Sequence, residues 1–229
     1  MATFGLVHGV CAGAWSWDLL RPYLEEAGHD VAAVDLPCDE PEAMFSDYAR
    51  VVDGALPPAT DDIVLVGHST GGFTIPLVAA LRPVRELVYL CATLPVPGES
   101  VAEHGVDWGV VDSAEWQVYN SDGSFSITHD GLIRHVAQDV DRALVDEIAA
   151  RLRPQFLAPF TERCPLDAMP DVASRYILCS EDHIVSPEWS RRVAGQRLGV
   201  EAVQLPGSHS PMASRPAELA NALLSLSRS

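Results

Sequence analysis

The chain has 229 residues, 48% of them hydrophobic and 21% charged, which suits one globular domain with a substantial core. Its formal net charge is -17 and all 15 basic residues are arginine, so the surface repels phosphate backbones and nucleic acid is not expected as a partner. The N-terminus has no basic region, and no apolar run is long enough to span a membrane, so we expect a cytoplasmic protein.

Segments that resemble strands alternate with segments that resemble helices along most of the chain. The expected strands, which are short and apolar, cover residues 3–7, 31–34, 63–66, 87–91, 176–179 and 202–205. The expected helices, which repeat apolar side chains at helical spacing, cover residues 18–27, 44–55, 73–81, 141–152 and 216–226. Pro76 is expected to kink the third of these helices or to start a new turn in it.

This alternation predicts an α/β fold, with a mostly parallel sheet of about six strands flanked by helices. Functional sites in such sheets lie at the carboxyl ends of the strands. Residues 94–170 interrupt the alternation after the fourth strand, and residues 120–124 resemble the turn of a hairpin. Three aromatic residues of this segment are of the kind expected in or near a pocket wall: Trp108, Trp116 and Tyr119. We expect 94–170 to form a cap over a substrate cavity, and 1–93 with 171–229 to form the core.

Five cysteines are scattered along the chain, at positions 11, 38, 91, 164 and 179. Their number is odd and no pair has C-x-x-C spacing. This pattern favours free thiols, mostly buried, in a reducing compartment. The sequence leaves the oligomeric state open, with a homodimer as one option.

Residues 67–71 have the sequence Gly-His-Ser-Thr-Gly and directly follow the apolar strand 63–66. This is the G-x-S-x-G pattern, in which the serine lies on a sharp turn from a strand to a helix. The flanking glycines leave room for the neighbouring strand and helix, so the turn can hold the serine hydroxyl out over the sheet edge. Ser69 is therefore the candidate nucleophile, close to the positive end of the next helix.

Two later loops offer partners for Ser69, because a serine hydroxyl needs a base in hydrogen-bond reach and the base needs an acceptor. Asp182 follows the fifth expected strand and His209 follows the sixth. The chain order serine, aspartate, histidine matches hydrolases that carry a G-x-S-x-G turn. Glu181 remains an alternative acid, and we prefer Asp182 because a shorter side chain is the commoner solution at such a loop position.

The other histidines are expected to have supporting or unrelated roles. His183 is a rival base, but its closeness to the acid makes it an awkward partner. His8 and His68 flank strand ends and are interpreted as structural hydrogen-bonding residues behind the site. Three more lie in the cap, where surface or structural roles are expected: His104, His129 and His135.

A negatively charged intermediate would need two backbone donors. We expect them to be the amide of Thr70, directly after the nucleophile, and the amide of Val10 in the loop after the first strand. The candidate pocket residues are Gly9, Cys11, Trp108, Trp116, Phe156, Leu157, Phe160 and Met212.

With these motifs, nearly the whole chain resembles the α/β-hydrolase superfamily, and within it the plant methylesterase and hydroxynitrile lyase group and its bacterial esterase relatives. The resemblance is carried by residues 6–17, 27–31, 67–72, 150–162, 179–182 and 208–212. It implies an α/β-hydrolase fold with a small cap, and the triad Ser69, Asp182 and His209.

The chain also departs from that group at two positions of its first loop. Hydroxynitrile lyases of the group resemble the esterases but carry a threonine where this chain has Gly9, and a pocket lysine, whereas this chain has no lysine. Lyase activity is therefore not expected. Many methylesterases of the group have a histidine where this chain has Ala12, so the acyl side of the pocket is expected to differ.

These observations lead to a serine hydrolase that cleaves a small carboxylic ester through an acyl-enzyme, with no metal or cofactor implied. The expected partner is a small-molecule ester or a related carbonyl compound, and binding to a membrane is not expected. One alternative is a tailoring enzyme of the same fold, such as a thioesterase or lyase, acting on a natural-product intermediate. A second alternative is a hydrolase homologue that only binds a ligand.

Overall fold

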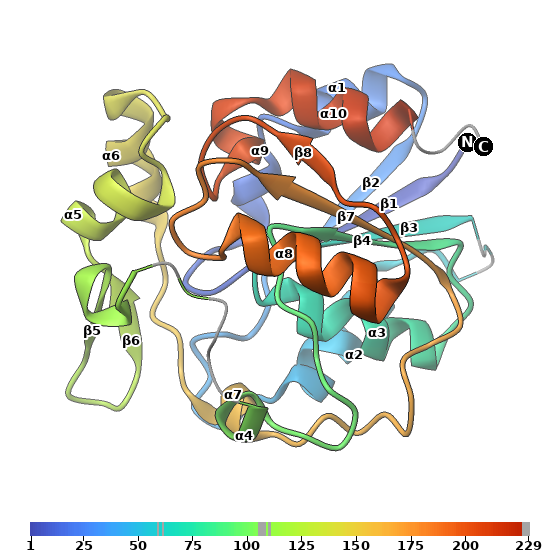
Figure 1. Cartoon of the computed structure of the whole chain (residues 1–229), viewed down its shortest axis with the longest axis horizontal. Helices are drawn as coiled ribbons and strands as arrows, with labels where there is room; N and C mark the ends of the chain where they lie inside the picture. The colour runs from blue at the N-terminus through green and yellow to red at the C-terminus, as the bar shows by residue number, and fades with distance from the viewer. Residues whose placement is uncertain (59, 61, 105–108, 110, 226–229) are drawn as a thin grey trace.

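Six strands form the main sheet of the computed structural model, which describes residues 1–58, 60, 62–104, 109 and 111–225 (Figure 1). The strands are β1 Thr3–Val7, β2 Asp30–Ala33, β3 Ile63–His68, β4 Glu86–Leu90, β7 Ala173–Cys179 and β8 Val203–Leu205. They pair in parallel in the order β2-β1-β3-β4-β7-β8. The predicted α/β architecture is confirmed. The order reverses between β1 and β3, and ligands of such sheets bind at that crevice.

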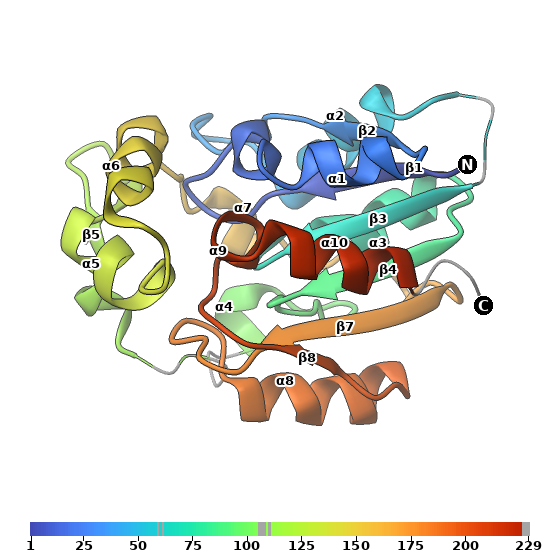
Figure 2. The ribbon, with the colours of Figure 1, turned by 90° about the horizontal axis from the view of Figure 1, so that it is seen from above.

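Alternate residues of each strand pack on opposite faces of the sheet, as the two-residue period of a strand requires. In β3, Ile63 and Leu65 join one buried cluster, and Val64 and Val66 join the other. The helices that cover the first face are α2 Phe45–Ala55, α3 Gly71–Leu81 and α8 Pro187–Val193; α1 Arg21–Glu26 and α10 Pro216–Ser225 cover the second (Figure 2). The sheet is therefore the middle layer of three.

The insertion (residues 94–170) leaves the sheet after β4 and returns to it at β7. Its elements are α4 Val101–His104, η2 Ser113–Glu115, β5 Gln117–Tyr119, β6 Phe125–Ile127, α5 His129–Gly131, η3 Leu132–Val136, α6 Arg142–Arg151 and α7 Ala158–Thr161. The hairpin β5–β6 and helices α5 and α6 stand to one side of the sheet, whereas α4 and α7 lie near each other beyond α2 and α3 (Figure 1). The division of the chain into a core and a cap stays a prediction.

Some elements differ from the sequence-based expectation at their boundaries. The helix expected over 18–27 is the shorter α1, preceded by a turn at 18–20 and by the 3-10 helix η1 Ala14–Trp17, because Pro22 lacks an amide donor and fits only the first turn of a helix. Pro76 lies inside α3 and does not end it. Helix α8 and the π-helix η4 Ala194–Leu198 were not expected, and residue 226 lies outside the described part.

The five cysteines are free, as predicted, and only Cys164 is more than slightly exposed. Among the helices that the structure describes, none combines the length and apolar character needed to cross a bilayer.

Candidate active site

Ser69 lies on the sharp turn between β3 and α3, with a φ of 54°, a value that non-glycine residues rarely adopt. Its amide donates to the carbonyl of Leu90 at 3.1 Å, which ties the turn to the neighbouring strand. The glycines around it have no room for a side chain: a Cβ at Gly67 would lie 2.7 Å from the carbonyl oxygen of Gly71, and one at Gly71 would lie 2.6 Å from that of Val7. The backbone packing of the sheet thus holds Ser69 in a strained position.

Asp182 lies on the loop after β7 and is buried. Its Oδ1 accepts hydrogen bonds from the amides of Ile184 at 2.8 Å and Val185 at 2.9 Å, which stabilise the ionised carboxylate. Its Oδ2 lies 2.8 Å from Nδ1 of His209. Glu181 is exposed, so of the two candidate acids the structure brings Asp182, and not Glu181, to the histidine.

His209 lies on the loop after β8 and is also buried. With its Nδ1–H donated to Asp182, its Nε2 is the free, basic nitrogen. The imidazole of His68 donates from Nε2 to the carbonyl of His209 at 2.8 Å, and the two ring centroids are 4.7 Å apart. Burial lowers the pKa of His68 well below its ordinary value, so His68 is a neutral support for the loop, as its structural interpretation predicts.

Ser69 and His209 line one cavity of about 540 Å³, which is mostly apolar. The floor comes from the loops after β1, β3, β4, β7 and β8, and much of the rest comes from the insertion. The side chain of Ser69 makes no hydrogen bond within the described part of the chain, and hydroxyl-to-base contacts of this kind often tighten only when substrate is present.

Two residues whose backbone amides are unpaired within the described part of the chain line the same cavity as Ser69. Val10 and Thr70 line the cavity, and among the residues that the structure describes neither amide donates to a backbone carbonyl. The loop of Val10 is held by His8, whose Nε2 accepts from the amide of Leu36 at 3.0 Å and whose Nδ1 donates to the carbonyl of Gly9 at 2.7 Å. Burial lowers the pKa of His8 to about 4, which keeps this bridging ring neutral.

Gly9 lies against the nucleophile. A Cβ added at this position would lie 2.8 Å from Cβ of Ser69 and 3.3 Å from its Oγ. The backbone at Gly9 does not have a positive φ, so the limit there is space and not conformation. A side chain at residue 9 would therefore fit only if Ser69 moved.

The predicted pocket residues have different outcomes. Five of them line the cavity: Gly9, Trp116, Leu157, Phe160 and Met212. Two do not: Cys11 is fully buried with its thiol directed at the carbonyl of Phe125, and Phe156 is off the cavity wall. Burial also raises the pKa of the Cys11 thiol to about 12, so it is not a reactive group. Trp108 lies outside the described residues.

Several cavity residues were missed by sequence reasoning. The most prominent are Trp15, Phe125, Leu132, Val136, Ile148 and Arg151. The expected stripe of the helix at 141–152 does contain Ile148, but a stripe does not reveal which face of a helix meets a cavity. Arg151 joins the insertion to the first loop, because its guanidinium is 3.0 Å from the carboxylate of Asp18 and lies over the ring of Trp15 at 4.9 Å.

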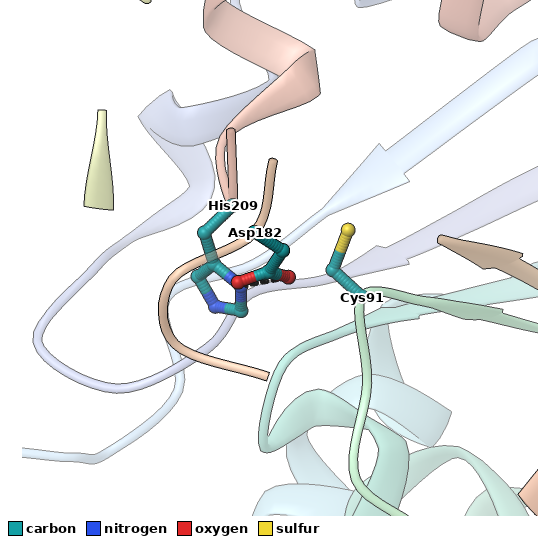
Figure 3. A group of neighbouring side chains, drawn as sticks. All are labelled: Cys91, Asp182 and His209. Carbon is teal, nitrogen blue, oxygen red and sulfur yellow. Dashed lines mark hydrogen bonds and ion pairs between the residues drawn. The ribbon is translucent and has the colours of Figure 1, made fainter. Parts of the chain in front are cut away.

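Figure 3 shows the Asp182 carboxylate between the imidazole of His209 and the thiol of Cys91. The three potential ligand atoms lie within 4.8 Å of one another, and all three residues are buried. Both carboxylate oxygens are already occupied, Oδ1 by two amides and Oδ2 by His209. Burial also raises the pKa of the Cys91 thiol well above its usual value, which keeps it protonated. The group fits an internal acid–base pair better than a metal centre.

Comparisons with known proteins agree with this architecture. Norfluorocurarine synthase 2 of a Strychnos species is 30% identical over 97% of this chain and 94% of that protein. Methylesterase 2 of Arabidopsis thaliana is 26% identical over 97% of this chain and 95% of its own length. Polyneuridine aldehyde esterase of Rauvolfia serpentina is 39% identical, but that match spans only 43% of this chain and 41% of the relative.

Solved structures extend the likeness to the whole chain. The crystal structure of polyneuridine aldehyde esterase superimposes with a TM-score of 0.79, with 26% identity and 99% of both chains covered. The resemblance to the methylesterase group is confirmed by these relatives. The sequence profile of the alpha/beta hydrolase family matches residues 6–222. The chain belongs to that family.

Proposed function

We propose that this protein is a serine hydrolase that cleaves a carboxylic ester, with Ser69, His209 and Asp182 as its triad. The observation that carries the proposal is the buried pair of His209 and Asp182, 2.8 Å apart, in which His209 lines the cavity that also contains Ser69. Relatives named esterase and methylesterase support ester cleavage.

The first half of the reaction forms an acyl-enzyme. Nε2 of His209 accepts the proton of the Ser69 hydroxyl while Oγ attacks the ester carbonyl carbon. Asp182 stabilises the resulting imidazolium, because its Oδ2 accepts from Nδ1 of His209 at 2.8 Å. The tetrahedral intermediate then collapses, the bond to the alcohol oxygen breaks, and His209 returns the proton to the leaving alcohol.

The second half of the reaction releases the acid. A water molecule gives a proton to Nε2 of His209 and attacks the acyl carbon, and the bond to Oγ of Ser69 breaks as Oγ takes the proton back. In both halves the amides of Val10 and Thr70 donate to the oxyanion. Their lack of an internal partner supports this role, since a donor engaged elsewhere could not serve.

The cavity favours an ester whose acyl and alcohol parts are mainly apolar. Its lining is dominated by aliphatic and aromatic side chains, and its volume of about 540 Å³ lies in the range of small-molecule sites. Arg151 is the one arginine in the lining within the described ranges, and it is engaged by Asp18. A substrate that carries a free carboxylate near the ester would find no unpaired cation there.

The test is hydrolysis of a panel of methyl and p-nitrophenyl esters of increasing acyl size by the wild type and by Ser69→Ala. We expect turnover by the wild type and a loss of at least about a thousandfold in the variant, with labelling of Ser69 by a fluorophosphonate. Turnover that survives in Ser69→Ala would refute the proposal. Absence of both turnover and labelling would instead favour a protein that only binds its ligand.

A tailoring enzyme is the second candidate, because the relative that is 30% identical over 97% of this chain is named a synthase. Such an enzyme would use the same triad on a natural-product intermediate. It would be indicated by a Ser69 that is labelled by the fluorophosphonate although no ester of the panel is turned over.

A further inference from the structure

One stretch of the insertion contacts both loops that hold Asp182 and His209. We call residues 134–139 the clasp; they comprise the end of the π-helix η3 and the loop after it. Figure 1 shows this part of the insertion beside α5 and α6, at the end of the sheet where the strands finish. The insertion thus supplies more than a roof for the cavity.

The clasp holds the acid loop on both sides of Asp182. The Nε2 of Gln138 donates to the carbonyl of Glu181 at 2.6 Å. On the other side, Nδ1 of His183 donates to the carbonyl of Arg134 at 3.3 Å. Each contact involves a residue directly adjacent to Asp182, so a shift of the clasp moves the carboxylate that orients the histidine.

The clasp also holds the loop of His209. The hydroxyl of Ser210, the next residue after His209, donates to the carbonyl of Val136 at 3.0 Å. The carboxylate of Asp139 fills the space beside Gly207, where an added Cβ would lie 2.4 Å from Oδ2, and it lies 3.6 Å from Nε of Arg215. The base loop is therefore hydrogen-bonded to the clasp directly after the histidine and lies close against it before the histidine.

The same stretch forms part of the cavity wall. Val136 of the clasp lines the cavity together with Leu132, which lies two residues before the clasp, and the carbonyl of Val136 is the acceptor for Ser210. A ligand that presses on this wall acts on an element bonded to both triad loops. Packed interiors transmit such displacements because they have few voids to absorb them.

We propose that the clasp positions Asp182 and His209 for catalysis, with Gln138 of the clasp and Ser210 of the base loop as the two positioning residues. The inference rests on the proposed function, because positioning matters only if these residues act as a triad with Ser69. It makes the alignment of the triad depend on the insertion, and hence on how well a substrate fits the wall at Leu132 and Val136.

The central test is Gln138→Met, which removes the donor to the carbonyl of Glu181 while keeping the length of the side chain. Because Gln138 does not line the cavity, the change should not alter contacts with the substrate. With the best ester of the panel, we expect kcat to fall about tenfold while KM changes less than about twofold, since a displacement of about 1 Å at a catalytic group can cost a hundredfold. The rate of fluorophosphonate labelling of Ser69 should fall in parallel with kcat.

Ser210 offers a matched pair of variants. Ser210→Ala removes the hydroxyl that reaches Val136, and Ser210→Thr keeps it. We expect the alanine variant to lose kcat to a similar degree and the threonine variant to recover most of it. His129→Gln is the control, because the imidazole of His129 bonds to Asp146 within the insertion and does not line the cavity, and this variant should leave kcat unchanged.

Two results would overturn the inference. One is a Gln138→Met variant that keeps the wild-type kcat and labelling rate, whether or not its midpoint of urea unfolding changes. The other is a loss of kcat in His129→Gln as large as that in Gln138→Met, which would indicate general damage to the insertion. Turnover that does not require Ser69 would refute the proposed function instead, and so the two failures are distinguishable.

Discussion

The two halves of the candidate site are built by different means. On the nucleophile side, Gly9, Gly67 and Gly71 let backbone segments approach so closely that a Cβ would lie within 2.8 Å of another atom. On the acid–base side, Asp182 and His209 lie on loops that side-chain hydrogen bonds join to the insertion. The first half belongs to the sheet, and the second half is shared with the insertion.

This difference implies that the two sides of the site tolerate substitutions to different degrees. A backbone contact between strands has no alternative arrangement, so the nucleophile side should be rigid and intolerant of any added atom. Loops that are held by single hydrogen bonds can shift by small amounts at a moderate cost. We therefore expect evolution to adjust this enzyme through the acid–base side and the insertion. The sharp turn at Ser69 between β3 and α3, here called the elbow, should stay fixed.

The largest effect is expected from Asp182→Asn, which breaks the acid–base side at its centre. The amide would still reach His209, but it can present its NH₂ group and so favour the wrong tautomer of the imidazole. Turnover of the best ester should fall about ten thousandfold in kcat, measured at pH 7.

The neighbouring acid provides the matched comparison. Glu181→Gln should keep the wild-type kcat, because the Glu181 side chain is exposed and only its backbone carbonyl bonds to Gln138. Equal losses in the two variants would mean that the assignment of the acid is wrong.

The nucleophile half was accessible from the sequence for a physical reason. The spacing of glycines around Ser69 encodes the close approach of strands and helix, so five letters describe a three-dimensional arrangement. The alternation of strands and helices gave the sheet in the same way, because each pattern has its own period. Local rules suffice where the contacts are made by the backbone.

The other half could be predicted only in part. Chain order identified Asp182 and His209, but nothing local indicated that Gln138, more than 40 residues before Asp182, would bond to its neighbour. The expectation that Cys11 and Phe156 face the cavity failed because a loop, unlike a strand, has no period that assigns side chains to a face. Short helices such as α8 were missed because a few residues carry too little periodicity.

A smaller effect is expected from Gly9→Ala, which breaks the nucleophile side. The added Cβ would lie 2.8 Å from Cβ of Ser69, so either the loop of Val10 or the elbow must shift. A shift of this kind misplaces the nucleophile and one oxyanion donor together, and we expect kcat to fall about a hundredfold. The measurement is steady-state hydrolysis of the best ester.

Gly54→Ala is the control for that variant, because nothing lies within 4 Å of the position where its Cβ would be built. It should keep the wild-type kcat and gain about 0.5–1 kcal/mol of unfolding free energy in its helix. If Gly9→Ala were as active as Gly54→Ala, the packing of the first loop against Ser69 would not matter for the reaction.

The smallest effect is a loss of unfolding free energy at acidic pH. It arises from His8, whose ring is hydrogen-bonded to the carbonyl of Gly9. The ring is buried, and its pKa is lowered to about 4 from an ordinary value of 6.5. Between these two pH values the unfolded chain binds a proton that the folded chain does not, so the contribution is complete above pH 6.5 and is lost progressively down to about pH 4. From pH 6.5 to pH 5 this amounts to about 2 kcal/mol of unfolding free energy.

Urea unfolding at pH 6.5 and pH 5, in the wild type and in His8→Gln, measures this contribution. Glutamine offers a donor and an acceptor to Gly9 and Leu36 but does not titrate, so the variant should lose about 2 kcal/mol less than the wild type over this interval. Comparing the two proteins removes the contributions of other groups, His68 included. Equal losses would mean that His8 accepts a proton in the folded protein at pH 5. The ring that holds the loop of Gly9 and Val10 would then not be neutral.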